Sequence, residues 1–198
     1  MTPDDFFSLA DVRRGHFQYE SGFHSNLWLD LETLCHHPEI LRPFVVELCS
    51  RIADFTPDVI CGPLIEGAFV ALLAASELRR EFVYTLRLGD TSDRRMFPVT
   101  YELPQSLRSV VTGKRVIIVN DVISAGSAVL GALQSLRMAG AQVVAIASLV
   151  VLGESFLAVA QQENIPLTTL LNLPNDMWEP ENCPLCTDKV PLQRLADY

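Results

Sequence analysis

The chain has 198 residues, of which 49% are hydrophobic and 20% are charged, and its formal net charge is −9. This length favours a single domain, residues 1–198, with a real hydrophobic core. The acidic balance argues against nucleic acid as a partner, because neutralising phosphates needs clustered Lys and Arg. No apolar run reaches the length of a membrane span and the start is polar, so we expect a soluble, cytoplasmic protein.

Helical and extended segments alternate along the chain. In order, the pattern predicts a helix at 4–14, extended stretches at 16–19 and 26–31, a helix at 38–55, a strand at 58–61, a helix at 68–78, strands at 81–88 and 97–103, a strand from 116, a helix at 127–138, a strand at 142–151, a helix at 155–162 and a strand at 167–173. Because strands alternate with helices, we expect an α/β fold with a mostly parallel sheet flanked by helices.

The segment 116–129 reads as a buried strand, a polar end, a turn of small residues and a helix. The turn suits a phosphate, because small residues allow close approach and the first N–H groups of the following helix have no partner within it. Its residues are Ser124, Ala125, Gly126, Ser127 and Ala128. Asn120 and Asp121 precede the turn, about where the hydroxyls of a ribose would lie. The alternative is a ligand-free turn in which Asp or Ser only caps the helix.

This segment resembles the signature of the type I phosphoribosyltransferases for phosphoribosyl pyrophosphate (PRPP). The signature is four apolar residues, two acids, two apolar residues, Thr/Ser, Ala/Gly, Gly and Thr/Ser. Residues 116–127 match every position but one, since Asn120 stands where the family usually has an acid. The resemblance implies the type I phosphoribosyltransferase fold, with a small hood from residues 1–35 and the C-terminal tail, and a homodimer. It also implies that a nucleobase displaces pyrophosphate from PRPP, with Mg²⁺ bound mainly through PRPP.

The resemblance also assigns roles to the residues of the signature and of the loop near residue 62. Asp121 would hold the ribose hydroxyls, with Asn120 as a weaker neighbour, and the turn 124–128 would hold the 5′-phosphate. Gly62 and Gly67 would bring the loop between them against the pyrophosphate, because glycine permits a close approach. The alternative for that loop is an ordinary connection between a strand and a helix.

A polar stretch at 89–95 lies where the family has a flexible catalytic loop. It carries Arg94 and Arg95, and Arg87 ends the preceding strand. Two arginines would clamp a pyrophosphate well. With Asp121, Arg94 and Arg95 are therefore our catalytic candidates. The alternative is that these arginines are solvated surface charges.

Two terminal stretches resemble orotate phosphoribosyltransferases, so we favour orotate as the base and orotidine 5′-monophosphate as the product. Residues 15–17, 21–22 and Ser25 match the hood, and residues 178–186 match a Pro-Glu-x-Cys-Pro-x-Cys ending. Ser25 and Trp28 are the candidate base-binding residues.

Three residues depart in charge from the family pattern. Glu20 and Glu66 stand where orotate enzymes often have Lys, and Asn120 replaces an acid. Lost cations near an anionic base and pyrophosphate are unfavourable. Two alternatives therefore stay open, namely an enzyme of this fold acting on another nucleobase and a non-catalytic regulatory protein that binds PRPP or a nucleotide.

Two of the five cysteines, Cys183 and Cys186, have the spacing of half a zinc site. No second CxxC and no HxxxH follows them, so we assign no protein ligand to a metal. We therefore favour a Pro-rich terminal segment with two unpaired thiols, as expected in a reducing compartment, and structural zinc is the alternative.

Overall fold

A six-stranded sheet forms the centre of the computed structural model, which describes residues 10–89 and 99–193. Its strands are β3 (Val59–Pro63), β4 (Glu81–Gly89), β5 (Val99–Glu102), β6 (Arg115–Ile123), β7 (Gln142–Leu152) and β8 (Leu167–Leu173). The strand order is β5-β4-β3-β6-β7-β8, and all neighbours are parallel except the pair β4 and β5. The predicted α/β fold with a mostly parallel sheet is confirmed.

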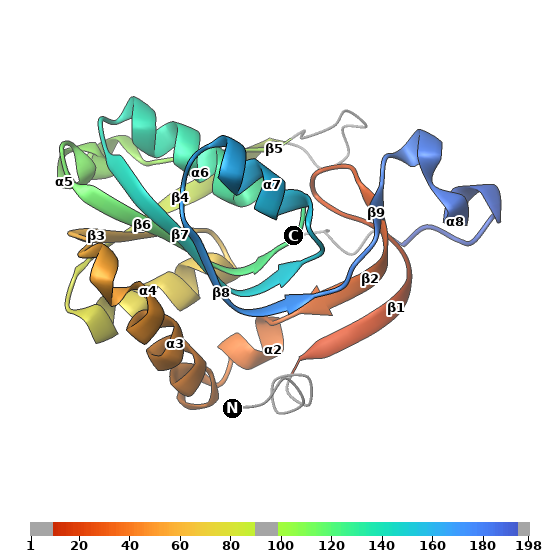
Figure 1. Ribbon diagram of the computed structural model, residues 1–198, viewed down its shortest axis with the longest axis horizontal. Coiled ribbons are helices and arrows are strands. Elements are labelled where there is room, and N and C mark those ends of the chain that lie inside the picture. The colour runs from red at the N-terminus through yellow and green to blue at the C-terminus, as the bar shows by residue number, and fades with distance from the viewer. Residues whose placement is uncertain (1–9, 90–98, 194–198) are drawn as a thin grey trace.

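Helices cover both faces of this sheet (Figure 1). α3 (Pro38–Ile52) and α4 (Glu66–Leu78) pack on one face, and α6 (Ser127–Met138) and α7 (Ser155–Gln162) pack on the other. The short helices α2 (Glu32–Cys35) and α5 (Arg108–Val111) lie in the connections. Within the ranges that the structure describes, no helix is long and apolar enough to cross a membrane.

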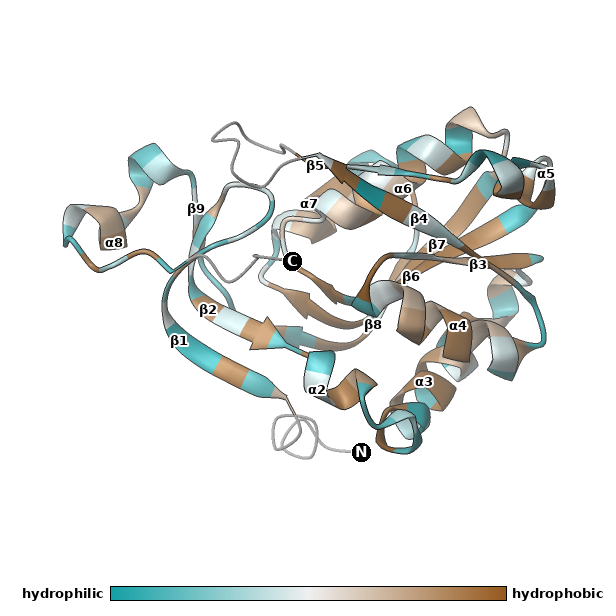
Figure 2. Ribbon diagram, turned by 180° about the vertical axis from the view of Figure 1, so that it is seen from behind, coloured by the Kyte–Doolittle hydropathy of each residue, from teal (hydrophilic) through white to brown (hydrophobic). Residues whose placement is uncertain are grey.

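The central strand β6 is buried on both faces, which explains its apolar run. Val116 and Ile118 face the core under α6 and α7, whereas Ile117 and Val119 face the core under α3 and α4. This alternation follows the two-residue period of a strand. Figure 2 shows the same apolar character along the middle strands. The strand therefore holds its carboxyl end, which carries Asn120 and Asp121, in a fixed position.

A smaller antiparallel sheet, which we call the hood, lies beside the carboxyl ends of β3 and β6. It consists of β1 (Asp11–Gln18), β2 (His24–Asp30) and β9 (Met177–Trp178), in the order β1-β2-β9. The helix predicted at 4–14 is wrong over residues 11–14, which pair with residues 27–30 of β2, and residues 4–9 lie outside the description. Strand pairing with β2 outweighs the helical charge pattern here. Arg13 and Arg14 are exposed, which suits the edge of a sheet.

The chain after β9 forms a tail that returns to the hood. It passes through α8 (Pro184–Thr187), which projects from the body of the molecule (Figure 1). The Gln18 amide then donates to the Gln193 carbonyl at 3.0 Å, and the Gln193 amide donates to the His16 carbonyl at 2.7 Å. Most side chains in 184–193 are exposed, so apolar burial contributes little to holding this tail in place.

Candidate active site

A cleft of about 250 Å³ opens between the hood and the carboxyl ends of β3 and β6. This is the edge at which open α/β sheets usually bind ligands. The polar residues and aromatic side chains that line it are Tyr19, Glu20, Ser21, Trp28, Asp30, Glu66, Arg87, Tyr101, Asn120, Asp121, Ser124 and Ser127. They come from four separate parts of the chain, which the sheet and hood bring together.

The turn between β6 and α6 forms the floor of the cleft at one end. Gly126 has φ +85°, and a Cβ added there would lie 2.1 Å from the ring of Phe156, so no larger residue fits. The first helical hydrogen bond of α6 runs from the Leu130 amide to the Gly126 carbonyl. The amides before it therefore have no helical partner, and no described side chain caps them. This turn offers an anion several N–H donors and the positive end of a helix dipole.

Asp121 lines the cleft from the end of β6. Burial, followed by the charges of Glu66 and Asp30, raises the pKa of Asp121 from its ordinary value of 3.8 to about 7. Hydrogen bonds from the backbone amides of residues 121 and 122 oppose this shift. Asp121 therefore loses its proton readily near neutral pH once a ligand supplies hydroxyl donors or positive charge.

Asn120, the neighbour of Asp121, is almost fully buried and fixed on both sides. Its Nδ2 donates to the Val122 carbonyl at 2.8 Å. A Cβ added at Gly67 would lie only 2.0 Å from the Asn120 Oδ1. Gly67 thus leaves the space that the Asn120 amide occupies, and the two positions depend on each other.

The loop after β3 carries Glu66 and Gly67 into the cleft lining. The Leu64–Ile65 peptide bond in this loop is cis. Glu66 begins α4, where a helix dipole favours an acid, and burial raises the pKa of its carboxyl. Gly62 does not line the cleft. A Cβ there would lie 2.6 Å from Ala68 Cα, so Gly62 allows β3 to pack against α4.

Glu20 connects the hood to the β4–β5 hairpin. The Arg87 Nε donates to the Glu20 Oε2 at 2.8 Å, and the Tyr101 hydroxyl donates to the same carboxylate at 3.0 Å. Arg87 and Tyr101 are cross-strand neighbours. Burial and then the charge of Glu20 raise the pKa of Tyr101, so its hydroxyl remains a donor. Arg87, the basic side chain in the described part of the lining, is thus paired with an acid.

Trp28 forms an aromatic part of the hood wall. Its ring centroid lies 6.0 Å from those of Phe17 and Tyr19, so packing fixes its orientation. Ser25 lies behind this wall and does not line the cleft. It is fully buried, donates to the Asn175 Oδ1 at 2.8 Å and accepts from the Leu27 amide at 3.1 Å.

The cleft thus brings together most of the site residues predicted from the sequence. Those in its lining are Trp28, Gly67, Arg87, Asn120, Asp121, Ser124, Gly126, Ser127 and Ala128. Ser25, Gly62 and Ala125 lie behind the lining, and Arg94 and Arg95 lie outside the described residues.

Sequence reasoning missed Tyr19, Asp30 and Tyr101 as parts of the cleft. Tyr101 had one signal, because it is an inward position in the alternating strand β5. Asp30 had a weaker one, as an acid that closes an apolar stretch. Both signals are common in strands without any site, so these residues could be assigned to the cleft only once the structure placed them in its lining.

Three comparisons place the chain among known proteins. A model described as phosphoribosyl transferase domain matches residues 38–163. The chain is 28% identical over 190 residues to the orotate phosphoribosyltransferase of Chlorobium phaeobacteroides (strain BS1), covering 96% of this chain and 91% of that protein. It is 29% identical over 191 residues to that of Helicobacter acinonychis (strain Sheeba), covering 90% of each.

Solved structures show the same fold at lower identity. The adenine phosphoribosyl transferase from Trypanosoma brucei, in complex with AMP, pyrophosphate and ribose-5-phosphate, has a TM-score of 0.66 at 19% identity, covering 91% of this chain and 82% of that one. The Mycobacterium tuberculosis H37Rv orotate phosphoribosyltransferase, in complex with inorganic phosphate, has a TM-score of 0.61 at 21% identity, covering 87% and 97%. The arrangement of sheet and helices is therefore shared with proteins that are named for different bases.

Proposed function

Because the chain belongs to the phosphoribosyl transferase domain family, we propose that it transfers the 5-phosphoribosyl group of PRPP to a nucleobase and releases pyrophosphate. The observation that carries this proposal is the shared cleft of Asp121 and the turn Ser124–Ala128. A 5′-phosphate at the amino end of α6 would place the ribose next to Asp121. The transition state of such a displacement resembles an oxocarbenium ion, so positioning and nearby negative charge would supply the catalysis.

The charge of the cleft supports a substrate that carries its own cation. Four acids line the described part of the cleft, Glu20, Asp30, Glu66 and Asp121, whereas Arg87 is its basic residue. A bare pyrophosphate would be repelled by these carboxylates. Oxygen-rich surroundings with net negative charge fit Mg²⁺ held mainly by PRPP. The cation would neutralise the leaving pyrophosphate, and the acids would contact its water shell.

Orotate is our first candidate for the base. It is the base in the names of the sequence relatives at 28–29% identity. The match to the Chlorobium phaeobacteroides protein covers 96% of this chain, so it reaches into the hood and the tail as well as the sheet. The wall formed by Trp28 offers a flat surface for any pyrimidine or purine ring.

A neutral nucleobase is the second candidate, and Glu20 is the observation that favours it. An anionic base entering from the hood side would meet this carboxylate, whereas an amino group of a neutral base would donate to it. The Glu20–Arg87 pair has side chains that are each 23% exposed, so its charges remain within reach of a ligand.

A pyrophosphate-release assay with PRPP, Mg²⁺ and a panel of free bases tests the proposal. Release with orotate alone supports the first candidate, and release with a different base supports the second. Binding of PRPP by calorimetry without release from any base would refute the enzyme and leave a nucleotide-binding regulatory protein. Asp121→Asn should abolish most of the release, whereas Asp54→Asn, the same change at an exposed position, should not.

A crystal soaked with ribose-5-phosphate tests the site separately from the base. We expect the phosphate at the amides of 124–128 and the sugar hydroxyls at Asp121. An empty turn, or one filled by side chains, would refute the assigned pocket even if the protein proved active.

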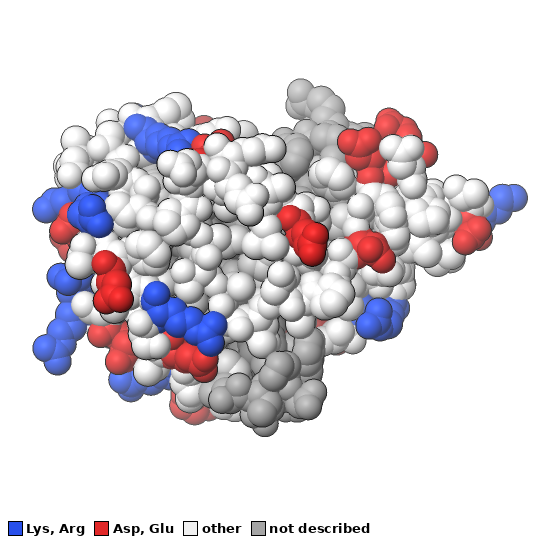
Figure 3. Space-filling view, viewed as in Figure 1, with Lys and Arg blue, Asp and Glu red and all other residues white. Residues whose placement is uncertain are grey.

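We extend the proposal to a homodimer and to small-molecule substrates in the cytoplasm. Exposed apolar side chains repeat at helical spacing from the N-cap of α4 into the helix, at Ile65, Phe69 and Leu72, which are 47%, 46% and 50% exposed. Such a stripe is typical of a protein interface. On the face shown in Figure 3, basic side chains are scattered among acidic ones, which gives no support to nucleic acid as a partner.

A further inference from the structure

Two histidines and two cysteines, residue types that commonly bind zinc in proteins, lie close together where the hood meets the tail. We call this group, His16, His24, Cys183 and Cys186, the hood–tail cluster. Its four candidate ligand atoms all lie within 4.8 Å of one another, and three of the four residues are buried. His16 comes from β1, His24 from β2, and the two cysteines from the N-cap and body of α8. The cluster joins distant parts of the sequence, since 158 residues lie between His24 and Cys183.

The distances between the ligand atoms match a single tetrahedral ion. With ordinary bond lengths, tetrahedral zinc sets its ligands apart by about 3.4 Å for two nitrogens and about 3.6 Å for nitrogen and sulfur. The His16 Nε2 lies 3.0 Å from the His24 Nδ1. The Cys183 and Cys186 sulfurs lie 3.4 and 3.8 Å from the His16 Nε2, and the Cys186 sulfur lies 3.3 Å from the His24 Nδ1.

A hydrogen bond behind the cluster prepares one histidine to act as a ligand. The His16 Nδ1 lies 2.8 Å from the Val190 carbonyl, which can only accept. The proton of the neutral ring therefore belongs on Nδ1, and Nε2 turns its lone pair toward His24 and the two sulfurs. Zinc-bound histidines are held in this way by an outer carbonyl or carboxylate.

The tail has little else to hold it. α8 buries none of its residues, and the last described residues, 187–193, are exposed. Small segments without a core of their own commonly gain their stability from a metal. A hydrogen-bonded group of two imidazoles and two thiols would contribute far less, because thiols are weak donors and acceptors.

We propose that the hood–tail cluster binds one structural Zn²⁺ ion, which fastens the tail to the hood. Two thiolates and two imidazoles form a complete tetrahedral set, so no position remains open for a substrate. Cys186 is the exposed member and gives the ion a path from solvent. Binding converts the two thiols to thiolates and releases their protons, with no change of oxidation state. The turn between His16 and His24 carries Tyr19, Glu20 and Ser21 into the cleft, so the ion would order one wall of that cleft from outside.

Metal analysis of the full-length protein, purified in reductant without added metal, tests the proposal. We expect elemental mass spectrometry of the purified protein to find about one zinc ion per chain. The metal-free protein, titrated with Co²⁺, should give the absorption of tetrahedral thiolate-bound cobalt, which Zn²⁺ then displaces. Chelation should lower the Tm by on the order of 10 °C, and Zn²⁺ alone should restore it.

Cys186→Ser separates loss of the metal from loss of the fold, because its side chain is exposed. Removing a ligand should weaken Zn²⁺ binding beyond the roughly 10–100-fold that loss of an outer hydrogen bond costs. Cys35→Ser, a partly buried cysteine outside the cluster, should retain the full zinc content. Two results would overturn the proposal: a wild-type protein that binds neither Zn²⁺ nor Co²⁺ when reduced, or a Cys186→Ser variant with unchanged affinity. Neither readout depends on transferase activity, so the proposed function stands or falls separately.

Discussion

Replacing Asp121 by Asn should stabilise the protein while weakening its action on PRPP. The carboxylate lies among other acids in the cleft, and its pKa is raised from 3.8 to about 7, first by burial and then by Glu66 and Asp30. A raised pKa means that folding binds the proton more tightly. The acid therefore costs no stability below about pH 4, and its cost grows until the pH passes about 7.

The size of this cost follows from the two pKa values. Each pKa unit corresponds to about 1.4 kcal/mol, so the difference between 3.8 and about 7 gives an upper limit of about 4 kcal/mol. Asp121 is partly exposed to an open cleft, so water screens much of this cost. We expect Asp121→Asn to raise the free energy of unfolding by about 1–2 kcal/mol above pH 7.

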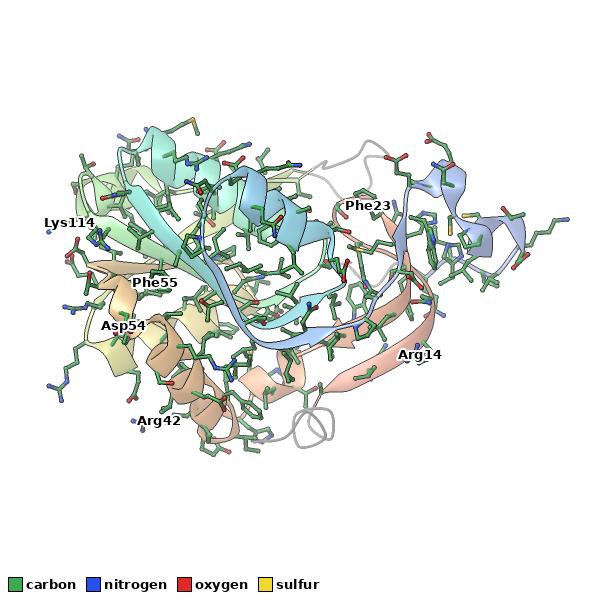
Figure 4. The ribbon with its side chains drawn as sticks, viewed as in Figure 1. Arg14, Phe23, Arg42, Asp54, Phe55 and Lys114 are labelled. Atoms are coloured by element: carbon green, nitrogen blue, oxygen red, sulfur yellow. The ribbon has the colours of Figure 1, made fainter. Side chains whose placement is uncertain are left out.

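Urea unfolding of the ligand-free protein at about pH 8 and about pH 5 measures the effect. The gain should be larger at the higher pH and should shrink toward about pH 4. Asp54→Asn provides a matched control, because Asp54 is exposed near the end of α3, far from the hood (Figure 4), and should change stability by less than about 0.5 kcal/mol. An equal gain at both pH values, or a loss at pH 8, would refute the electrostatic reasoning.

The same Asp121→Asn variant should lose transition-state stabilisation. Hydrogen bonds to charged groups contribute roughly 1.5–3 kcal/mol each, so losing one from the ribose should lower kcat/KM by about 10- to 150-fold. A variant that is both more stable and fully active would show that Asp121 does not contact the sugar.

Three other changes test separate parts of the structure. Gly67→Ala should lower the free energy of unfolding by about 1–3 kcal/mol, because its Cβ would meet the Asn120 Oδ1; Asn120→Ala should remove most of that cost in the double variant, and additive effects would contradict the contact. Glu20→Gln should improve kcat/KM for orotate relative to neutral bases, and an unchanged ratio would show that Glu20 does not select the base. Phe69→Asp should yield a monomer by sedimentation that keeps the fold by circular dichroism, since this side chain is exposed on the single chain; a dimer that persists would place the interface elsewhere.

The local sequence pattern was sufficient to predict secondary structure wherever the burial of a segment follows from its own residues. The apolar run of β6 and the period of α3 predict structures that pack against the core, and both formed as predicted apart from small shifts at the ends. The small residues of 124–128 also predicted the turn. The structure contains it, and Gly126 there has a left-handed φ and no room for a Cβ.

The local pattern gave wrong or incomplete predictions where contacts with residues distant in sequence determine the structure or the role of a residue. Residues 11–14 have helical charge signals but pair with β2. Glu20 read as a lost cation, yet in the fold its carboxylate is bound by Arg87 and Tyr101 from a hairpin more than 60 residues away. A search for metal ligands after Cys183 likewise passed over His16 and His24, which we propose as ligands, because both precede it in the sequence and lie near it only in the folded protein.

The residues that match the family model, 38–163, contain every strand of the six-stranded sheet except β8, together with the turn 124–128 and Asp121, but none of the hood. The wall with Glu20 and Trp28 is built from the two ends of the chain, which meet through β9 and Gln193. Under the proposed function, the residues for chemistry at the sugar and those for choice of the acceptor base would therefore lie in separate stretches of the sequence. If so, exchanging both termini with those of a relative, while leaving the middle intact, should redirect the protein to the acceptor of that relative.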